Sequence, residues 1–397
     1  MSTTDGHFGA QCPPAEQAAP DFPVVLLAVG AGIGVANVYY SQPILHLVER
    51  QFQAGPEQAG LVATLTQIGY GVGLLLLAPL GDLTDRKRLI AAKALLLALA
   101  LAASALAPTL PVLIASGVAI GLLGSVGQDF ISLAAQLAPE ARRGWTVGTV
   151  MTGFLIGILC SRTLGGFIAE FFGWRSVFWG AVVLIGVVAL AAWRLLPAVA
   201  PAARGTYIGL LGGLWELVKN RAVLRKSMMT QALIAGSLGA FWSTLAMMLA
   251  EPPFALGAGL AGVFGLAGAA GALAAPLFGH LADRSGPMVP IRAGCLLVVA
   301  AFGLMPLVPG SLWVLGIGAV LFDLGVMASM ISHQAIINGL DASARSRLNG
   351  LLVTAAMAGV AAGTWVGNWA FAQFGWNGVC AVGIFAGASA LARSLIR

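Results

Sequence analysis

The chain has 397 residues, of which 59% are hydrophobic and only 9% are charged. Soluble globular proteins carry about 25% charged residues, so this composition excludes a soluble protein and indicates an integral membrane protein. Apolar runs long enough to cross a bilayer recur from Pro23 almost to the C-terminus and leave no room for a catalytic domain outside the membrane. The net charge of +6 does not indicate nucleic-acid binding, because the basic residues follow the ends of the apolar runs.

The predicted elements begin with residues 1–20, a polar segment without lysine or arginine. A signal peptide has a basic start, so we expect instead a disordered cytoplasmic tail. Hydropathy and turn signals then predict six membrane-spanning helices and, after a basic loop, six more. The sequence therefore predicts an all-α integral membrane protein with twelve transmembrane helices in two pseudo-symmetric six-helix bundles. The predicted spans are 23–46, 59–80, 89–107, 111–137, 146–169, 176–193, 227–250, 258–279, 290–307, 312–339, 348–371 and 377–393.

The positions of the basic residues predict the orientation. If the N-terminus is cytoplasmic, every Lys and Arg except Arg50, Arg162 and Arg175 lies in or beside a cytoplasmic segment, Lys93 included. Cytoplasmic loops are enriched in these residues, so we expect both termini in the cytoplasm and the protein in the inner (plasma) membrane. The predicted domains are a bundle over 21–195, a cytoplasmic linker over 196–226 with an interfacial helix, and a bundle over 227–397.

Two stretches of the sequence recur. PLGDLTDR (79–86) returns 198 residues later as PLFGHLADR (276–284), and FFGWRSVF (171–178) returns 202 residues later as QFGWNGVC (373–380). Each pair falls at the same place within its six-span half, which indicates a duplicated six-helix unit. Because six is even, both halves insert with the same orientation, and such transporters hold their substrate near the midplane between the repeats. Alternating access is the function that this symmetry supports.

The repeated motif resembles a family signature. GDLTDRKR and GHLADRSGP are similar to the G-x-x-x-D-R-x-G-R-R motif of major facilitator superfamily (MFS) transporters, and the resemblance extends from about Asp21 to Arg393. In that family the Asp and Arg of the motif hold the cytoplasmic gate closed. The resemblance therefore implies a gating role for Gly81, Asp85, Arg86, Gly279, Asp283 and Arg284.

The fifth predicted span resembles the antiporter motif of the same family, a glycine-rich helix that ends in G-P-x-x-G-G. Its glycines match at Gly148, Gly157, Gly165 and Gly166, whereas Ser161 and Arg162 replace the G-P pair. NVYYSQPIL in the first span and FWSTLAMMLAEPPF in the seventh resemble a bacterial efflux-permease-like branch. The sequence departs from drug-efflux antiporters in having no arginine in the fourth span and no acidic residue in the first.

Three charged residues are predicted inside the bilayer. Asp129, Arg162 and Asp323 each cost about 2.5–3.5 kcal/mol at the centre of a span, and such groups usually face a cavity or a partner. A rise of 1.5 Å per residue places Asp129 about 13 Å from Arg162 in depth and Asp323 close to it. We interpret Arg162 as a contact for substrate or coupling, since guanidinium binds carboxylate or phosphate, and the two aspartates as proton or cation sites. The alternative for all three is a structural ion pair.

Neutral polar residues complete the predicted cavity. His333 lies near the cytoplasmic end of the tenth span and titrates in the range of a proton relay; the alternative is a simple hydrogen bond. Hydrogen bonds to a polar solute are expected from Asn37, Tyr40 and Gln42 in the first span and Gln67 in the second, although such side chains also bond neighbouring helices.

These features predict a secondary active transporter, a proton-coupled efflux antiporter of a small organic solute. The alternative within this class is an importer or exchanger of organic anions that uses Arg162, and a remote alternative is a membrane sensor. The sequence contains no GxxxxGK[ST], HExxH or GxSxG motif and no paired histidines, so we expect no enzyme activity, cofactor or metal. The expected partners are a small-molecule solute, protons and the lipid bilayer, with no nucleic acid, and the chain is expected to be a monomer.

Overall fold

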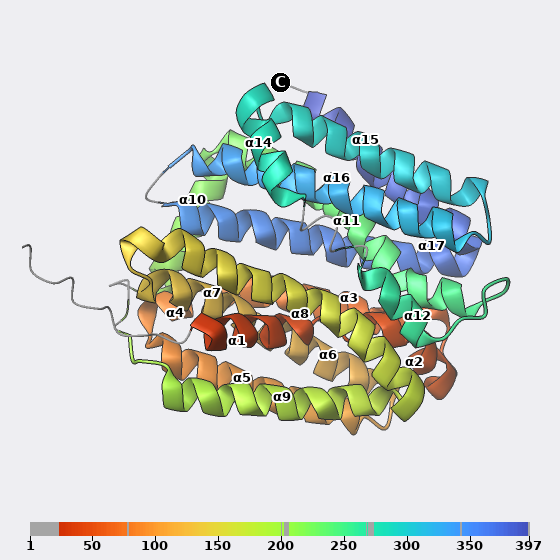
Figure 1. Cartoon of the computed structure of the whole chain (residues 1–397), viewed down its shortest axis with the longest axis horizontal. Coiled ribbons are helices and arrows are strands. Elements are labelled where there is room, and N and C mark those ends of the chain that lie inside the picture. Colours follow the sequence, from red (N-terminus) through yellow and green to blue (C-terminus); the bar gives the residue numbers. More distant parts are fainter. Residues whose placement is uncertain are drawn as a thin grey trace, which may run out of the picture.

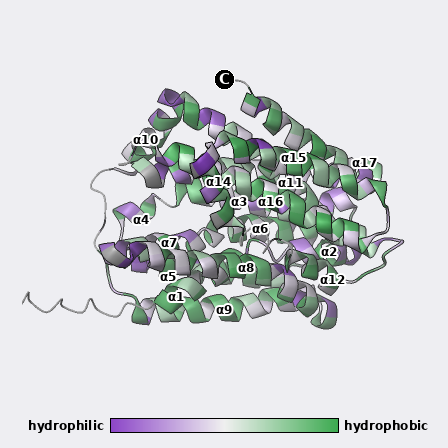
Figure 2. Ribbon diagram, turned by 45° about the horizontal axis from the view of Figure 1, so that its top comes forward, coloured by the Kyte–Doolittle hydropathy of each residue, from purple (hydrophilic) through white to green (hydrophobic). Residues whose placement is uncertain are grey.

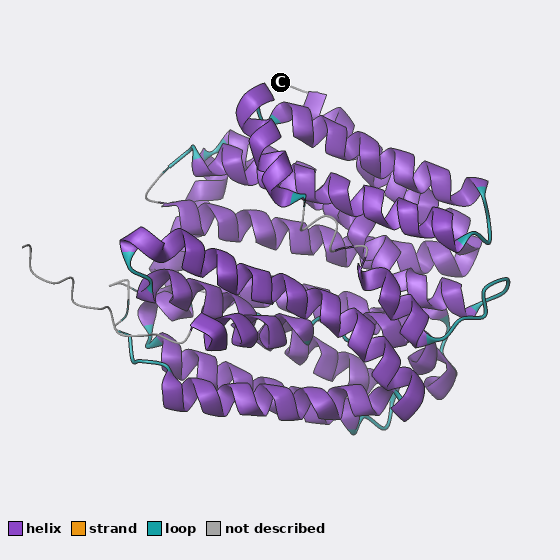
Figure 3. Ribbon diagram, in the orientation of Figure 1, coloured by secondary structure: helices purple, strands orange, loops and turns teal. Residues whose placement is uncertain are grey.

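The computed structural model describes residues 24–77, 79–199, 201, 206–266, 268, 274–341 and 344–395. The tail predicted over residues 1–20 lies outside this part. Helices are the only regular elements among the described residues, and short turns join them (Figure 3). The all-α prediction is therefore confirmed for the described chain.

Residues 24–199, called here the first half, form helices that pack on one another, with α3 against α6, α5 against α9 and α1 against α8 (Figure 1). Glycines allow the close approach: a Cβ on Gly117 would lie 2.8 Å from Thr66 Oγ1, so a larger residue would push α6 away from α3. The helices of this half are α1 Val24–Ala36, α2 Leu45–Phe52, α3 Pro56–Leu76, α4 Leu80–Leu83, α5 Arg86–Ala105, α6 Leu110–Gly124, α7 Val126–Leu137, α8 Arg143–Phe172 and α9 Trp174–Leu195.

Residues 222–395, the second half, repeat this kind of packing, with α11 against α17 and α15 against α16. Aromatic residues stabilise it: the Phe241 ring lies 4.6 Å from Phe322 and 5.7 Å from Trp376, centre to centre. The helices of this half are α11 Ala222–Ala250, α12 Ala258–Val263, α14 Ala275–Ser285, α15 Met288–Leu304, α16 Leu312–Asn338 and α17 Arg345–Leu395.

Several predicted spans are not separate, uninterrupted helices. The first consists of α1, a turn, the 3₁₀ turn Gln42–Ile44 and α2, because Pro43 has no N–H for a helical bond to the residue four positions earlier. The eighth begins with α12 and ends with α14. The eleventh and twelfth form the two parts of α17, which bends at Gly375, where φ is 61°, a backbone conformation that favours glycine.

Nine of the described helical segments have the length and the apolar composition needed to cross a membrane. Large apolar side chains are exposed on their outer faces, for example Val183, Val187 and Leu190 on α9, and Figure 2 shows hydrophobic residues along the length of the helices. In water such a surface is unfavourable, whereas in a bilayer it contacts lipid. The surface therefore fits a multi-pass membrane protein.

The molecule has two ends, which we name by their residues. The basic end carries Arg86, Arg143 and the helix α10, Tyr207–Asn220, and the far end carries α2 and Gly173. α10 connects the halves and contacts both α11 and α17. The Tyr207 hydroxyl donates a hydrogen bond to the Leu76 carbonyl oxygen of α3 at 2.8 Å, so this helix contacts both halves at the basic end.

Candidate functional site

Arg162 lies in the interior between the two halves. It is 8% exposed, and its guanidinium carbon lies 4.2 Å from the centre of the Trp242 ring and 5.0 Å from that of Tyr39. Its Nε donates a hydrogen bond to Gln42 Oε1 at 2.9 Å. Two aromatic faces and an amide oxygen thus replace the water that a buried guanidinium loses.

The break in the first predicted span positions two of these partners. Helix α1 ends at Ala36, and the following turn and 3₁₀ segment carry Tyr39 and Gln42. Irregular backbone at membrane depth occurs where it is buried in protein or lines a cavity. The break therefore places both side chains against α8, which carries Arg162.

Asp323, in α16 of the second half, belongs to the same cluster. It is 6% exposed, its carboxyl accepts a hydrogen bond from the Trp242 side chain, and it lies within electrostatic range of Arg162. Trp242 therefore contacts the cation of the first half and the carboxyl of the second half. The sequence placed Arg162 and Asp323 at similar depth, and the structure brings them together. We call Tyr39, Gln42, Arg162, Trp242 and Asp323 the Arg162 cluster.

The cavity beside the Arg162 cluster is small. It has a volume of about 10 Å³, which is about the space that one water molecule needs. An organic solute does not fit this cavity without movement of the halves. Its lining residues are Gln42, Pro43, Arg162, Trp242, Leu245, Ala246 and Ala261.

Asp129 forms an ion pair with a residue that the sequence did not predict as its partner. Lys93 Nζ lies 2.5 Å from Asp129 Oδ2, with both side chains buried. The sequence grouped Lys93 with the basic residues in or beside the cytoplasmic segments. In the structure its side chain faces α7 and the residue is 3% exposed. A signal was present: Ile90, Lys93 and Leu97, at helical spacing, share the buried face of α5.

The remaining predicted polar residues lie apart from the Arg162 cluster. Asn37 donates to the Ile33 carbonyl oxygen of its own helix. Gln67 is 1% exposed, and its amide atoms have no hydrogen-bond partner among the described residues. Tyr40 lies beside Gly165, 3.2 Å from the position that a Cβ there would take. His333 Nδ1 lies 2.9 Å from the Ser329 carbonyl oxygen, a local contact in α16.

The first copy of the repeated motif forms ion pairs at the basic end. Asp85 caps α5 by accepting a hydrogen bond from the Lys87 N–H at 3.0 Å, and Arg86 pairs with Asp82 rather than with Asp85. Gly81 leaves space for the Arg86 guanidinium, since a Cβ there would lie 3.3 Å from it.

The second copy of this motif lies at the end of α14, where Arg284 is exposed. The surroundings of Gly279 and the side chain of Asp283 lie outside the described part of the structure. Within that part, no group of three His, Cys, Asp or Glu side chains is placed to hold a metal ion.

At the far end, side chains of α8 form hydrogen bonds with the backbone of α12. Thr163 Oγ1 donates to the Gly262 carbonyl oxygen at 2.9 Å, and the Gly259 N–H donates to Glu170 Oε2 at 2.7 Å. A Cβ on Gly262 would lie 3.0 Å from Thr163 Cα. At the basic end a cavity of about 100 Å³ lies between the halves, with α3, α10 and α17 in its wall together with Arg86 and Arg347. The halves therefore contact each other directly through α8 and α12 at the far end, whereas this cavity lies between them at the basic end.

Curated relatives resemble the chain over most of its length. The family model of the Major Facilitator Superfamily matches residues 26–340. The chain is 38% identical over 360 residues to the uncharacterized transporter YgaY of Escherichia coli O157:H7, which covers 91% of each protein. It is 34% identical over 358 residues to the probable transporter SCO4007 of Streptomyces coelicolor, which covers 90% of this chain and 83% of the relative.

Solved structures share the fold. The chain matches a mutant of the nucleoside transporter NupG with a TM-score of 0.75 at 13% identity, over 94% of this chain and 98% of the other. It matches an inward-facing bacterial homologue of the human lysosomal transporter Spinster with a TM-score of 0.70 at 16% identity, over 94% and 93%. Together with the curated relatives, these matches show that the chain is a multi-pass membrane transporter, not an enzyme, and that it belongs to the Major Facilitator Superfamily.

Proposed function

We propose that the chain exports a small organic solute in exchange for protons, by alternating access of two six-helix bundles over residues 21–195 and 227–397. The linker over 196–226, with α10 on the membrane surface, joins the bundles. We place the protein in the inner membrane as a monomer, with both termini and the basic end in the cytoplasm. The sequence repeat and the one-sided distribution of Lys and Arg support this arrangement.

The observation that carries the proposal is the meeting of Arg162 and Asp323 at Trp242. The cation comes from the first half and the carboxyl from the second. A solute bound between them contacts both halves, so its binding energy differs between conformations, as a ligand-driven change of state requires.

Proton coupling follows from the charge on Asp323. A cationic or neutral solute that uses the Asp323 carboxylate competes with a proton for the same oxygen atoms. In each cycle a proton enters from the far end, binds Asp323 and leaves at the basic end, and the solute moves in the opposite direction. The result is export driven by the inward proton gradient.

Import or exchange of organic anions is the second candidate, and the burial of Arg162 favours it. A guanidinium binds a carboxylate through two parallel hydrogen bonds. A solute carboxylate beside an ionised Asp323 would bring two negative charges together in a poorly solvated site, so Asp323 must carry a proton when such a solute binds. The anion and the proton then move in the same direction, which is opposite to the first case.

The direction of proton flux separates the two candidates. We would reconstitute the purified protein in liposomes with an internal pH dye and add anionic, neutral and cationic solutes. The first candidate predicts proton movement opposite to a cationic or neutral solute and loss of this movement in Asp323→Asn. The second predicts proton movement together with an anion and loss of it in Arg162→Gln. Glu57→Gln, at an exposed site of the far end, is the matched control and should behave as wild type.

Solute-driven flux without proton movement would exclude both coupled mechanisms.

We further propose that Asn37, Tyr40, Gln42 and Gln67 contact the solute when the cavity opens, and that His333 and Asp129 lie on the proton route toward the basic end. Gating at that end is assigned to Gly81, Asp85 and Arg86 and to their counterparts Gly279, Asp283 and Arg284. The unpartnered amide of Gln67 supports the solute contact, because buried amides normally have partners.

A further inference from the structure

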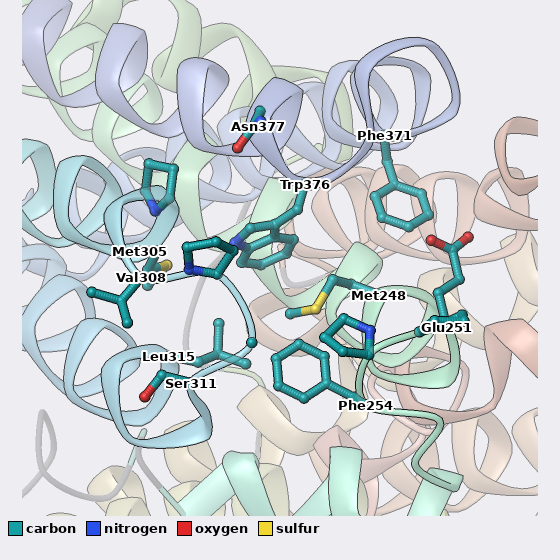
Figure 4. A pocket seen from close by; sticks show the side chains of 15 residues that line it. Met248, Glu251, Phe254, Met305, Val308, Ser311, Leu315, Phe371, Trp376 and Asn377 are labelled. Atoms are coloured by element: carbon teal, nitrogen blue, oxygen red, sulfur yellow. The ribbon is translucent and has the colours of Figure 1, made fainter.

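Another cavity lies at the far end of the second half, away from the Arg162 cluster. Its volume is about 270 Å³. Figure 4 shows the Trp376 ring, Met248 and Phe254 around it, with Glu251 on the loop that follows α11. Trp376 is half-buried, and Glu251 and Asn377 are exposed, so the cavity is reached from the aqueous side.

The sequence repeat identifies the counterpart of this cavity in the first half. The offset of 202 residues that aligns Trp174 with Trp376 also aligns Phe52 with Phe254 and Arg175 with Asn377. By the same offset Glu49 corresponds to Glu251, and Ala107 to Pro309. The aromatic and acidic positions are thus the same in both halves, and the arginine is present in the first half alone.

In the first half, Arg175 occupies this place. Its guanidinium carbon lies 4.3 Å from the centre of the Trp174 ring, and its Nη2 donates to the Ala107 carbonyl oxygen at 3.0 Å. The Phe52 ring also packs against Trp174, with the two ring centres 6.1 Å apart. The first half therefore holds a guanidinium of its own against this ring and this carbonyl oxygen.

In the second half the same surroundings have no cation. Asn377 is neutral, and no Lys, Arg or His is among the residues that line the cavity. Trp376 retains the aromatic ring, Glu251 supplies a negative charge, and Pro309 lines the cavity where Ala107 accepts the hydrogen bond in the first half. An aromatic face together with a carboxylate is the combination that binds ammonium and guanidinium groups.

We propose that this cavity binds a small organic cation of the guanidinium or alkylammonium class from the far end. The cation occupies the position that the Arg175 guanidinium holds in the first half. It contacts the Trp376 ring and pairs with Glu251. This site is separate from the Arg162 cluster and does not depend on the function proposed above.

The test measures binding of phenylguanidinium to the purified full-length protein by isothermal titration calorimetry. Phenylurea, which has nearly the same shape but no charge, is the matched ligand. We expect phenylguanidinium to bind at least tenfold more tightly than phenylurea. Equal affinity for the two ligands, or no binding of phenylguanidinium, would overturn the proposal.

Variants locate the binding. Asn377→Arg supplies the missing guanidinium from the chain itself and should abolish binding, whereas Glu251→Gln should weaken it about tenfold or more. Glu57→Gln, a carboxylate elsewhere on the far end, should bind as wild type. Wild-type affinity in Glu251→Gln contradicts the proposal even when Asn377→Arg does not fold, and loss of binding in Asp323→Asn would assign the cation to the carboxylate of the Arg162 cluster instead.

Discussion

Lys93 Nζ lies 2.5 Å from Asp129 Oδ2, and the two side chains are only 4% and 2% exposed. The pair joins α5 to α7 within the first half. Arg86 and Asp82, at the basic end, lie within electrostatic range of Asp129, so the pair is connected to the ion pairs of the repeated motif. It is a charged contact that does not involve the Arg162 cluster.

Removal of one member of this pair should destabilise the protein strongly. Lys93→Met or Asp129→Leu alone leaves an uncompensated buried charge, and such changes cost about 3–5 kcal/mol. The double variant removes both charges and should lie within about 1 kcal/mol of wild type or above it. Thermal unfolding in detergent, followed by tryptophan fluorescence, measures the complete double-mutant cycle. Additive effects of the two single changes would show that the contact contributes nothing.

Trp242 should affect coupling through its N–H and solute transport through its ring. Trp242→Phe keeps an aromatic face for Arg162 but removes the donor to Asp323, so we expect the pH profile of transport to shift while most of the rate remains. Trp242→Leu removes both contacts, and a desolvated cation–π contact is worth about 2 kcal/mol. We expect this variant to lose transport at least about tenfold. Indistinguishable pH profiles for Trp242→Phe and wild type would show that the N–H has no role in coupling.

Gly262→Val should open the far end. A Cβ at this position would lie 3.0 Å from Thr163 Cα, which is shorter than ordinary van der Waals contact, so α12 must move away from α8. Spin labels at Glu57 and Gln373, in a cysteine-free background, should report longer distances across the far end. Gly180→Val is the control, because a Cβ at this glycine would meet no atom within 4 Å. It should leave the distance distribution unchanged. The same distribution in both variants would mean that this contact does not hold the end closed.

Glu49 should make stability depend on pH. Burial raises the pKa of the Glu49 carboxyl, and the nearby Glu251 raises it further, while Arg50 acts in the opposite direction. The folded state therefore holds a proton more tightly than the unfolded state, so stability falls as the pH rises from the ordinary carboxyl pKa through the raised one. Glu49→Gln should be more stable than wild type above this window and equal to it below.

Melting temperatures at several pH values test this expectation. The difference between Glu49→Gln and wild type should grow with pH and then become constant. Glu57→Gln, on the same end of the molecule, should run parallel to wild type. A constant difference between Glu49→Gln and wild type at every pH would show that folding does not raise the pKa of the Glu49 carboxyl.

Hydropathy predicted the helical fold because the apolar residues that make a segment able to span the membrane are consecutive in the sequence. It also predicted Arg162 and Asp323 at similar depth, since a constant rise per residue converts sequence distance into height. The burial of Lys93 was not predicted for the same reason: its depth near the end of a span resembles that of a flanking residue. The neighbour that makes it a buried residue, Asp129, lies 36 residues away, and hydropathy contains no information on which helices touch.

Trp242 shows a second limit. An aromatic residue in an apolar helix is usually part of the packing, and nothing local to FWSTLAMML distinguishes a ring that contacts a buried arginine. The bend in the first span was equally hidden, although Pro43 indicated that a regular helix does not continue there. In both cases the missing information was a contact between distant segments, Trp242 with Arg162 in the first case and Gln42 with Arg162 in the second.

Helix α10 has a consequence for the energetics of transport. As a helix of 14 residues it is a rod about 21 Å long, and it is fixed to α3 by the Tyr207 hydroxyl and continues almost directly into α11. Ile208 and Trp215 are 80% and 68% exposed on it and are suited to insertion among lipid headgroups. If the halves rock as proposed and α10 lies among the headgroups, this helix must move through the headgroup layer in each cycle. The turnover rate should then vary with the lateral pressure and thickness of the surrounding bilayer.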